Sequence, residues 1–275
     1  MGLIERMRKN PATPVISLLT DFGLIDSYVS EMKAVILSIC PEARVIDISH
    51  CIEKFNVRMG AYVLAAAAKS FPAGAVHLAV VDPGVGGSRR PIVMETARSM
   101  FVGPDNGLLV PAAQAEGIVH VYHVTNRSII SSRVSATFHG RDIFAPVAAH
   151  LACGTPAMEC GAEITDFVKP SYAKPKISGK RIVCEVFHVD GFGNIVTNVR
   201  STQAPFNLSA KQKVKISIGN KHFSGRQVNT YSDLKKNEYG LLVGSHGFLE
   251  IACKEKSAAK RVRARTGMTV QFSSV

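Results

Sequence analysis

The stretch AVHLAVVDPGVGGSRR, residues 75–90, begins as an apolar run and ends in an aspartate, a glycine-rich turn and paired arginines. Its first part, AVHLAVV (75–81), is typical of a buried strand. A dinucleotide-binding loop would need GxGxxG, but Arg89 occupies the last glycine position, and the Gly-Lys-Ser/Thr of a Walker loop is absent. A turn with positive φ angles accounts for the glycines. It leaves Asp82 and the arginines unexplained.

The residues before this stretch alternate between strand-like and helix-like patterns. Alternation of this kind predicts a mostly parallel sheet with helices on its faces, in which ligands lie beyond the carboxyl ends of the strands. Asp21 and Asp82 each follow a predicted strand, so we expect both at that edge. The predicted elements are VISLLT (15–20), SYVSEMKAVILSIC (27–40), ARVIDIS (43–49), NVRMGAYVLAAAAKSF (56–71) and 75–81.

The chain changes character after residue 168. FVKPSYAKPKISGK (167–180) contains prolines, lysines and small polar residues, as linkers do, and short β-type runs separated by turn residues follow it. We therefore predict an α/β fold with a second, small all-β domain that is barrel-like. The expected divisions are an N-terminal extension (1–14), an α/β domain (15–168), a linker (169–180) and a β-barrel domain (181–275).

Composition is that of a globular protein, with 46% apolar and 20% charged residues. The longest apolar run, Ala61 to Ala68, is far shorter than the ~20 residues that cross a bilayer, and the opening residues lack an apolar signal core, so we expect a cytoplasmic protein and no membrane partner. The net charge of +12 is concentrated partly in KEKSAAKRVRAR (254–265). Because no basic stretch is interleaved with aromatic residues, nucleic acid is not expected as a partner.

The six cysteines stand singly in apolar surroundings, with no CxxC pair and no metal-finger spacing. We predict that all of them are reduced, buried thiols and that the protein holds no metal. These residues are Cys40, Cys51, Cys153, Cys160, Cys184 and Cys253.

Six motifs follow one another along both predicted domains. They are TDFGLIDSYV (20–29), VDPGVGG (81–87) followed by Arg89, GPDNGLL (103–109), TFHGRD (137–142), VDGFGN (189–194) and GSHGFLEIA (244–252). In this order they resemble one enzyme family, the S-adenosyl-L-methionine (SAM) hydroxide adenosyltransferases, which are related to fluorinase and chlorinase. The resemblance implies a Rossmann-like first domain, a β-barrel second domain and a homotrimer with active sites at subunit interfaces. It also implies hydrolysis of SAM to adenosine and methionine without a cofactor.

The family's catalytic Asp, Arg and His correspond to Asp82, Arg89 and His139. An arginine can hold an oxygen nucleophile electrostatically, and a histidine with an ordinary pKa near ~6.5 is a suitable proton acceptor. Asp82 could either orient Arg89 or share in accepting the proton. The halogenases that resemble this chain have a tyrosine in place of Asp82, so retention of all three residues favours water over halide as the nucleophile.

The same resemblance implies a set of binding residues. Asp21 can accept hydrogen bonds from the ribose hydroxyls, and Asn194 offers a donor and an acceptor to adenine. Taken alone, most of these residues would be turn, cap or core residues. The expected substrate-binding residues are Asp21, Asp26, Phe55, Asp190, Phe192, Asn194, Ser245 and His246.

Two positions depart from the family pattern. Lys54-Phe55-Asn56 stands where relatives commonly have Pro-Phe-Asp, which leaves the shape of that loop open. His246 stands where the halogenases have arginine, so carboxylate recognition can differ. Two alternative functions stay open: a halide-dependent SAM adenosyltransferase, and a protein that binds SAM or a nucleoside without turnover.

Overall fold

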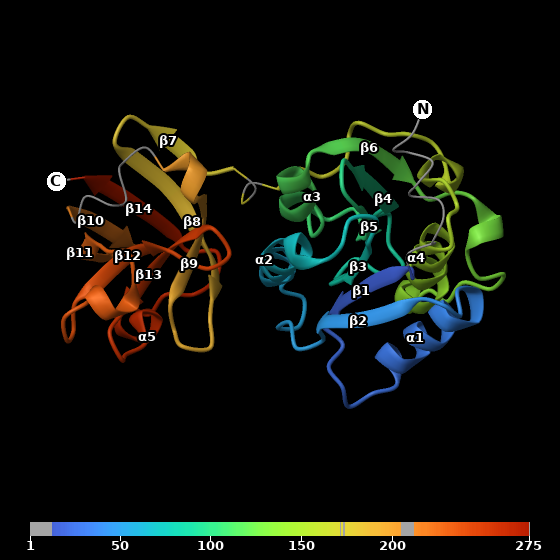
Figure 1. Cartoon of the computed structure of the whole chain (residues 1–275), viewed down its shortest axis with the longest axis horizontal. Coiled ribbons are helices and arrows are strands. Elements are labelled where there is room, and N and C mark those ends of the chain that lie inside the picture. The colour runs from blue at the N-terminus through green and yellow to red at the C-terminus, as the bar shows by residue number, and fades with distance from the viewer. Residues whose placement is uncertain (1–12, 171, 173, 205–211, 275) are drawn as a thin grey trace. The chain divides into compact units, whose positions relative to one another are not determined.

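The chain forms two compact units in a computed structural model, one ending at Lys169 and the other beginning at Pro170 (Figure 1). The structure describes residues 13–170, 172, 174–204 and 212–274. Residues 1–12, most of the predicted N-terminal extension, lie outside these ranges. Residues Lys176–Ser178, which belong to the predicted linker segment, form a short strand, β7.

A six-stranded sheet forms the centre of the N-terminal unit, in the order β2-β1-β3-β5-β4-β6. Strands β1, β2, β3 and β5 are parallel, and β4 runs antiparallel to both β5 and β6, so the predicted mostly parallel sheet is confirmed. The strands are β1 (Val15–Thr20), β2 (Arg44–Ser49), β3 (Val76–Val80), β4 (Pro91–Thr96), β5 (Met100–Pro104) and β6 (Ile118–His123).

Helices cover both faces of this sheet. Alternate residues of a strand point to opposite faces, so Leu18 packs with Met32 of α1 and Val147 of α4, whereas Leu19 faces α2, where Gly60 allows a close approach. The core therefore has one layer on each side of the sheet. The helices are α1 (Tyr28–Ile39), α2 (Val57–Ala67), α3 (Val110–Glu116) and α4 (Ala145–Ala152), with a π-helix at Gly140–Phe144 leading into α4.

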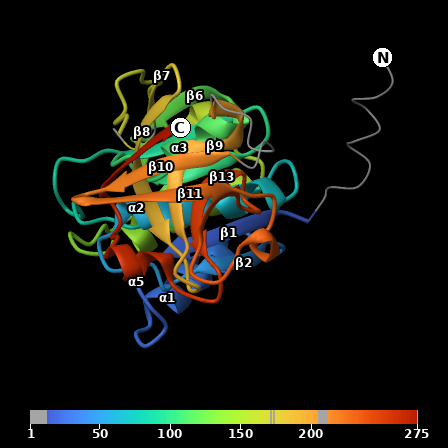
Figure 2. The ribbon, with the colours of Figure 1, turned by 90° about the vertical axis from the view of Figure 1, so that its left-hand side faces the viewer.

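The C-terminal unit is a β-barrel, as the spacing of short strands predicts (Figure 2). Seven strands follow the order β14-β10-β11-β12-β13-β9-β8, and pairing of β14 with β8 closes the barrel, with β7 added beside β8. The strands are β8 (Arg181–Val189), β9 (Ile195–Arg200), β10 (Lys213–Ile218), β11 (Lys221–Gln227), β12 (Tyr239–Val243), β13 (Phe248–Cys253) and β14 (Thr269–Ser274).

The basic segment 254–265 is folded onto this barrel. It contains the short helix α5 (Ala258–Val262), whose Ser257 side chain accepts a hydrogen bond from the Lys260 amide at the helix start. Ala258 and Val262 are buried in the barrel core. The segment is thus part of the domain, and its charged side chains project from an anchored helix.

None of the helices in the described part of the chain combines the length and the apolar character needed to cross a bilayer.

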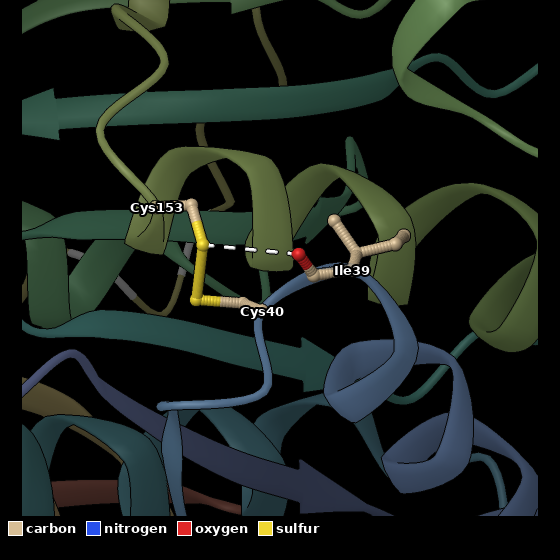
Figure 3. The surroundings of a disulfide bond; sticks show 3 residues. All are labelled: Ile39, Cys40 and Cys153. Atoms are coloured by element: carbon tan, nitrogen blue, oxygen red, sulfur yellow. Dashed lines mark hydrogen bonds between the residues drawn. A yellow bond between two sulfur atoms is a disulfide. The ribbon is translucent and has the colours of Figure 1, made fainter.

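The prediction that all cysteines are reduced and buried is wrong at three positions. Cys40 and Cys153 form a disulfide across a sequence separation of 113 residues (Figure 3), and Cys51 is exposed. Cys40 follows α1 and Cys153 follows α4, and these helices run side by side along the same face of the sheet. No local spacing can reveal such a pair, because packing of two distant helices creates it.

The disulfide predicts a measurable contribution to stability. Closing a loop of more than 100 residues restricts the unfolded chain, and loss of the bond should lower the free energy of unfolding by about 2–5 kcal/mol. Urea unfolding of Cys153→Ser under non-reducing conditions measures this difference, with Cys51→Ser as the control that removes an unpaired thiol. Reductant should destabilise the wild type and leave Cys153→Ser unchanged; equal stability of the two proteins without reductant would contradict the assignment.

Candidate active site

Three side chains from two separate motifs meet at the carboxyl end of β3. Arg89 donates from Nε to both carboxylate oxygens of Asp82, at 3.0 and 2.9 Å, and from Nη2 to Oδ2 at 2.5 Å. The same Nη2 lies 2.7 Å from Nδ1 of His139. Both ion-pair side chains are shielded, with 10% of Arg89 and 5% of Asp82 exposed. The structure thus brings together the three predicted catalytic residues around one guanidinium.

Gly86 explains how the glycine loop reaches His139. Its φ angle is +75°, and a Cβ atom placed there would lie 2.3 Å from the carbonyl oxygen of Ala136. Only glycine permits this approach, because both the backbone angle and the space exclude a side chain. The loop therefore packs directly against the segment that carries His139, three residues after Ala136. The glycines serve close packing between two loops.

The contact with Arg89 determines the tautomer of His139. A guanidinium only donates hydrogen bonds, so Nδ1 accepts and the hydrogen of the neutral ring lies on Nε2. Partial burial, followed by the positive charge of Arg89, lowers the pKa of His139 below its ordinary 6.5, although Asp82 and Asp142 act in the opposite direction. The imidazole is therefore neutral at physiological pH.

A second ion-pair network holds the turn that directly follows His139. Arg141 donates to both oxygens of Asp142 and, through Nη1, to Glu31 of α1 at 2.8 Å. Asp142 also accepts from the backbone amide of Ser135 at 2.8 Å. His139 directly precedes the π-helix that contains Arg141 and Asp142, and such irregular turns often occur at functional sites. Arg141 and Asp142 belong to the motif TFHGRD, but the motif alone does not reveal that their ion pairs hold the turn next to His139.

Asp21 lies at the carboxyl end of β1, as predicted, and is 5% exposed. One of its carboxylate oxygens accepts from the backbone amide of Phe55 at 2.8 Å. Phe55 adopts a φ angle of +64° and exposes 69% of its surface. Asn56 caps α2 by accepting from the Met59 amide, as an aspartate would at the same place. The change from Pro-Phe-Asp to Lys54-Phe55-Asn56 therefore retains the helix cap.

A buried histidine fixes the turn that presents Asp21. Nδ1 of His50 lies 2.8 Å from Oγ1 of Thr20, its Nε2 lies 3.1 Å from Asp47, and its carbonyl accepts from the Gly23 amide. The sequence pattern does not reveal this link between His50 and the turn that carries Asp21. Asp26, the other acidic residue predicted in this region, is exposed in the turn before α1.

Arg90 turns away from the catalytic group, unlike its neighbour Arg89. It donates to Asp105 from Nε and Nη2, at 3.1 and 2.8 Å, and to Asp166 from Nη1 at 2.8 Å. Asp105 also accepts from the Val168 amide. The second arginine of the pair is a structural residue that ties the loop to residues 166–168.

In the C-terminal unit, Asp190 and Asn194 close the turn between β8 and β9. Asp190 accepts from the amides of Phe192 and Asn194 at one oxygen and from the Asn194 side chain, at 2.9 Å, at the other. Gly193, with φ +86°, lies so close to Ser257 that a Cβ would clash with its side chain. In this turn 85% of the Phe192 side chain is exposed.

Ser245 and His246 lie in the separate turn between β12 and β13. This turn precedes Phe248, which pairs with Arg200, whereas Asn194 precedes Ile195, which pairs with Ile251, so the two turns adjoin strands that are paired neighbours. Ser245 is exposed and His246 is partly buried.

Glu250 is a residue near both turns that sequence analysis missed. It is 5% exposed, accepts from the Tyr231 hydroxyl at 2.8 Å, and lies so close to Gly244 that no side chain would fit there. Burial raises the pKa of Glu250, and the nearby charge of Asp190 adds to the increase. The charged residue inside the apolar run FLEIAC could have drawn attention to this position, because burial of a carboxylate costs free energy unless the group is hydrogen-bonded.

Comparison with known proteins agrees with this geometry. Residues 16–161 match the SAM hydroxide adenosyltransferase N-terminal domain, and residues 184–271 match the C-terminal domain of the same family. The chain is 41% identical to the (R)-S-adenosyl-L-methionine hydrolase of Salinispora tropica, covering 90% of this chain and 93% of that protein. It is 26% identical to a fluorinase of an Actinoplanes species, over 94% and 96% of the two chains.

Among solved structures, an uncharacterized conserved protein from Thermotoga maritima superposes with a TM-score of 0.85 at 38% identity, covering 94% of this chain and 99% of that one. Both units of the chain are therefore accounted for by one family. The matched domains, the identity to a hydrolase and the assembled Asp82–Arg89–His139 group together show that the chain belongs to the SAM hydroxide adenosyltransferase family.

Proposed function

We propose that this protein hydrolyses S-adenosyl-L-methionine to adenosine and L-methionine by displacement at the ribose 5′ carbon. The observation that carries the proposal is the Asp82–Arg89–His139 group, a shielded guanidinium held between a carboxylate and a neutral imidazole. SAM and water supply every atom of the products, so the reaction requires no cofactor. The name of the Salinispora tropica relative specifies the (R) form, which we extend to this chain as an expected substrate.

Arg89 is suited to hold the nucleophilic oxygen. Its Nε and Nη2 contact Asp82 and His139, whereas Nη1 makes no hydrogen bond to the described residues. The Nη1 hydrogens can therefore donate to a water molecule and stabilise the hydroxide that forms from it. Attack of hydroxide on the sulfonium substrate neutralises both charges, so a site that replaces solvent with fixed dipoles favours the displacement.

The proton released by water has two possible acceptors in this group, Asp82 and His139, because a guanidinium cannot take one. Asp82 is fully engaged by Arg89, and His139 is neutral with its lone pair on Nδ1. We assign the proton to Nδ1 of His139. The transfer requires the Nη2–Nδ1 contact to open, so that the Nη2–H group donates its hydrogen bond to the new hydroxide instead and keeps its proton, while the proton released by water binds to Nδ1.

The substrate would be held by residues of both units. The second carboxylate oxygen of Asp21 accepts no hydrogen bond from the described residues and could accept one from a ribose hydroxyl. Phe55 and Phe192 offer exposed rings to flank the nucleoside. Asp190, Ser245 and His246 are proposed for the amino-acid end, with Asn194 for adenine and Asp26 in a supporting role. We further propose a homotrimer in which neighbouring subunits complete each site.

A halide-dependent transferase is the second candidate, because the fluorinase is a relative over most of the chain. Two observations favour water: identity to the hydrolase is 41% against 26% for the fluorinase, and Asp82 with its Arg89 partner is retained.

Incubation of the purified protein with SAM should yield adenosine and methionine at rates independent of chloride. In H₂¹⁸O the adenosine should gain one heavy oxygen at its 5′ position, because the solvent oxygen attacks that carbon. Chromatography with mass spectrometry detects both outcomes, for each sulfonium epimer in turn. A chlorinated nucleoside would establish the transferase instead, and binding without any product would sink both enzymatic assignments.

Arg89→Ala and His139→Ala should each lower kcat by about 100-fold or more and change SAM binding little, because both groups act on the nucleophile. Arg89→Lys should also be impaired, since one ammonium cannot replace the forked contact with Asp82 and His139. Arg133→Ala, an exposed arginine nearby in sequence, is the control. Near-normal turnover of both alanine variants would refute the assigned roles.

The pH dependence of kcat/KM should follow the protonation of His139. The reaction needs the neutral ring, so the rate should fall as the pH drops through the pKa of His139. Because that pKa lies below 6.5, activity should persist to lower pH than an ordinary histidine would allow. A rate that rises only well above pH 6.5 would be inconsistent with His139 as the acceptor, and His139→Gln should abolish the acid limb.

A further inference from the structure

The net positive charge of this protein arises entirely from its C-terminal unit. Residues 1–169 contain 15 basic and 15 acidic side chains, whereas residues 170–275 contain 18 basic and 6 acidic ones. The whole net charge of +12 therefore belongs to the β-barrel unit. Neither the catalytic group nor the proposed substrate contacts require this excess, because SAM is itself a cation.

Strand register gathers part of this charge on the outer surface of the barrel. In β10, Val214 and Ile216 point into the core, so Lys213 and Lys215 point outward, and both are exposed. Ser273 of β14 pairs with Lys215 on one side and with Arg181 of β8 on the other. Arg181 and Lys215 therefore share one row, two strands or about 10 Å apart.

The adjoining strand extends the same surface. β11 pairs with β10 and contributes the exposed residue His222, which pairs with Ser217 of β10 and is bonded to it at 2.8 Å. We call this surface the outer strip, and it consists of Arg181, Lys213, Lys215 and His222. β8, β14, β10 and β11 follow one another around the barrel, so the strip is continuous.

Among the described residues, the lysines and the arginine of the outer strip have no acidic partner. Lys213 and Lys215 form no ion pair there, and Arg181 donates to the neutral Gln271. Their register partners are serine and arginine. The neighbouring Arg226 differs, because Glu238 neutralises it at 2.8 Å. A row of unneutralised cations on a rigid surface fits a polyanion.

The side chains that lie between and beside the basic residues indicate which class of polyanion this surface suits. Single-stranded nucleic acid is bound by stacking of bases on exposed aromatic rings. Among the described residues of this surface, Phe223 packs against Tyr239 with 4.4 Å between ring centroids, and the imidazole of His222 is bonded to Ser217 at 2.8 Å. Serine and glutamine side chains separate the cations, so the strip has no apolar residue to insert into a membrane. Contacts to phosphates of a duplex need neither feature.

We propose that the outer strip binds the phosphate backbone of duplex nucleic acid without sequence preference. The lack of aromatic residues interleaved with basic ones, which argued against nucleic acid from the sequence, excludes base stacking and leaves phosphate contacts possible. Binding at this surface would localise the enzyme and is independent of the proposed catalytic reaction.

Fluorescence anisotropy of the full chain with labelled RNA and DNA duplexes of mixed sequence tests the proposal. The wild type should bind several unrelated duplexes equally, with an affinity that falls steeply as salt increases. The variant Arg181→Gln/Lys213→Gln/Lys215→Gln should bind more weakly by the same factor for every duplex. The slope of log affinity against log salt should decrease by about 2 to 3, since each phosphate contact contributes roughly 0.9.

A matched variant separates the outer strip from general charge. Lys235→Gln/Lys236→Gln/Lys256→Gln removes three exposed cations outside the strip and should leave duplex binding largely unchanged. Turnover of SAM in both triple variants verifies that they fold. Absence of wild-type binding at low salt, equal loss in the two variants, tighter binding of single strands, or binding only to anionic lipid vesicles would each overturn the proposal.

Discussion

The forked guanidinium of Arg89 is the group on which the catalytic geometry depends. Asp82 accepts hydrogen bonds from two of its nitrogens, Nε and Nη2. The carboxylate compensates the positive charge, so that the Arg89 and Asp82 side chains can be as little as 10% and 5% exposed. Because Asp82 restrains the plane of the guanidinium, Nη2 is directed at His139 and Nη1 remains available for an oxygen ligand. A single contact pattern therefore sets the tautomer of the histidine and leaves a cationic donor for the nucleophile. Burial first, and then the charge of Arg89, lowers the pKa of His139.

Both halves of the proposed site depend on glycines that let backbone segments meet. Gly86 allows the loop after β3 to touch Ala136, and Gly193 allows the turn after β8 to touch Ser257. Each contact joins a turn that carries proposed site residues to a segment distant in sequence. The first segment directly precedes His139, and the second contains Ser257, the N-cap residue of α5. The glycine-rich motifs are thus places of close packing, and their side-chain chemistry resides in the flanking aspartates.

The sequence predicts those parts of the fold that local patterns determine. Apolar runs and helical spacing locate β1, α1, β2, α2 and β3, and the position of Asp21 and Asp82 after two parallel strands places both at one edge. Other features arise only when distant residues meet. The Cys40–Cys153 bond needs the packing of α1 against α4, and the hydrogen bond from Tyr231 to Glu250 needs two segments 19 residues apart to meet. The spacing of these pairs in the sequence does not reveal either contact, although a charged residue within FLEIAC is itself unusual.

The net charge of the whole protein and the charge of the acidic residues in the proposed site have opposite signs, and screening reconciles them. A net charge of +12 would repel a cationic substrate if it acted at long range. At physiological ionic strength exposed charges are screened beyond about 8 Å, whereas shielded ones are screened much less. Asp21, Asp190 and Glu250 are partly or fully buried, so their local field persists where that of exposed lysines decays. The two sets of charges can therefore serve different partners on one chain.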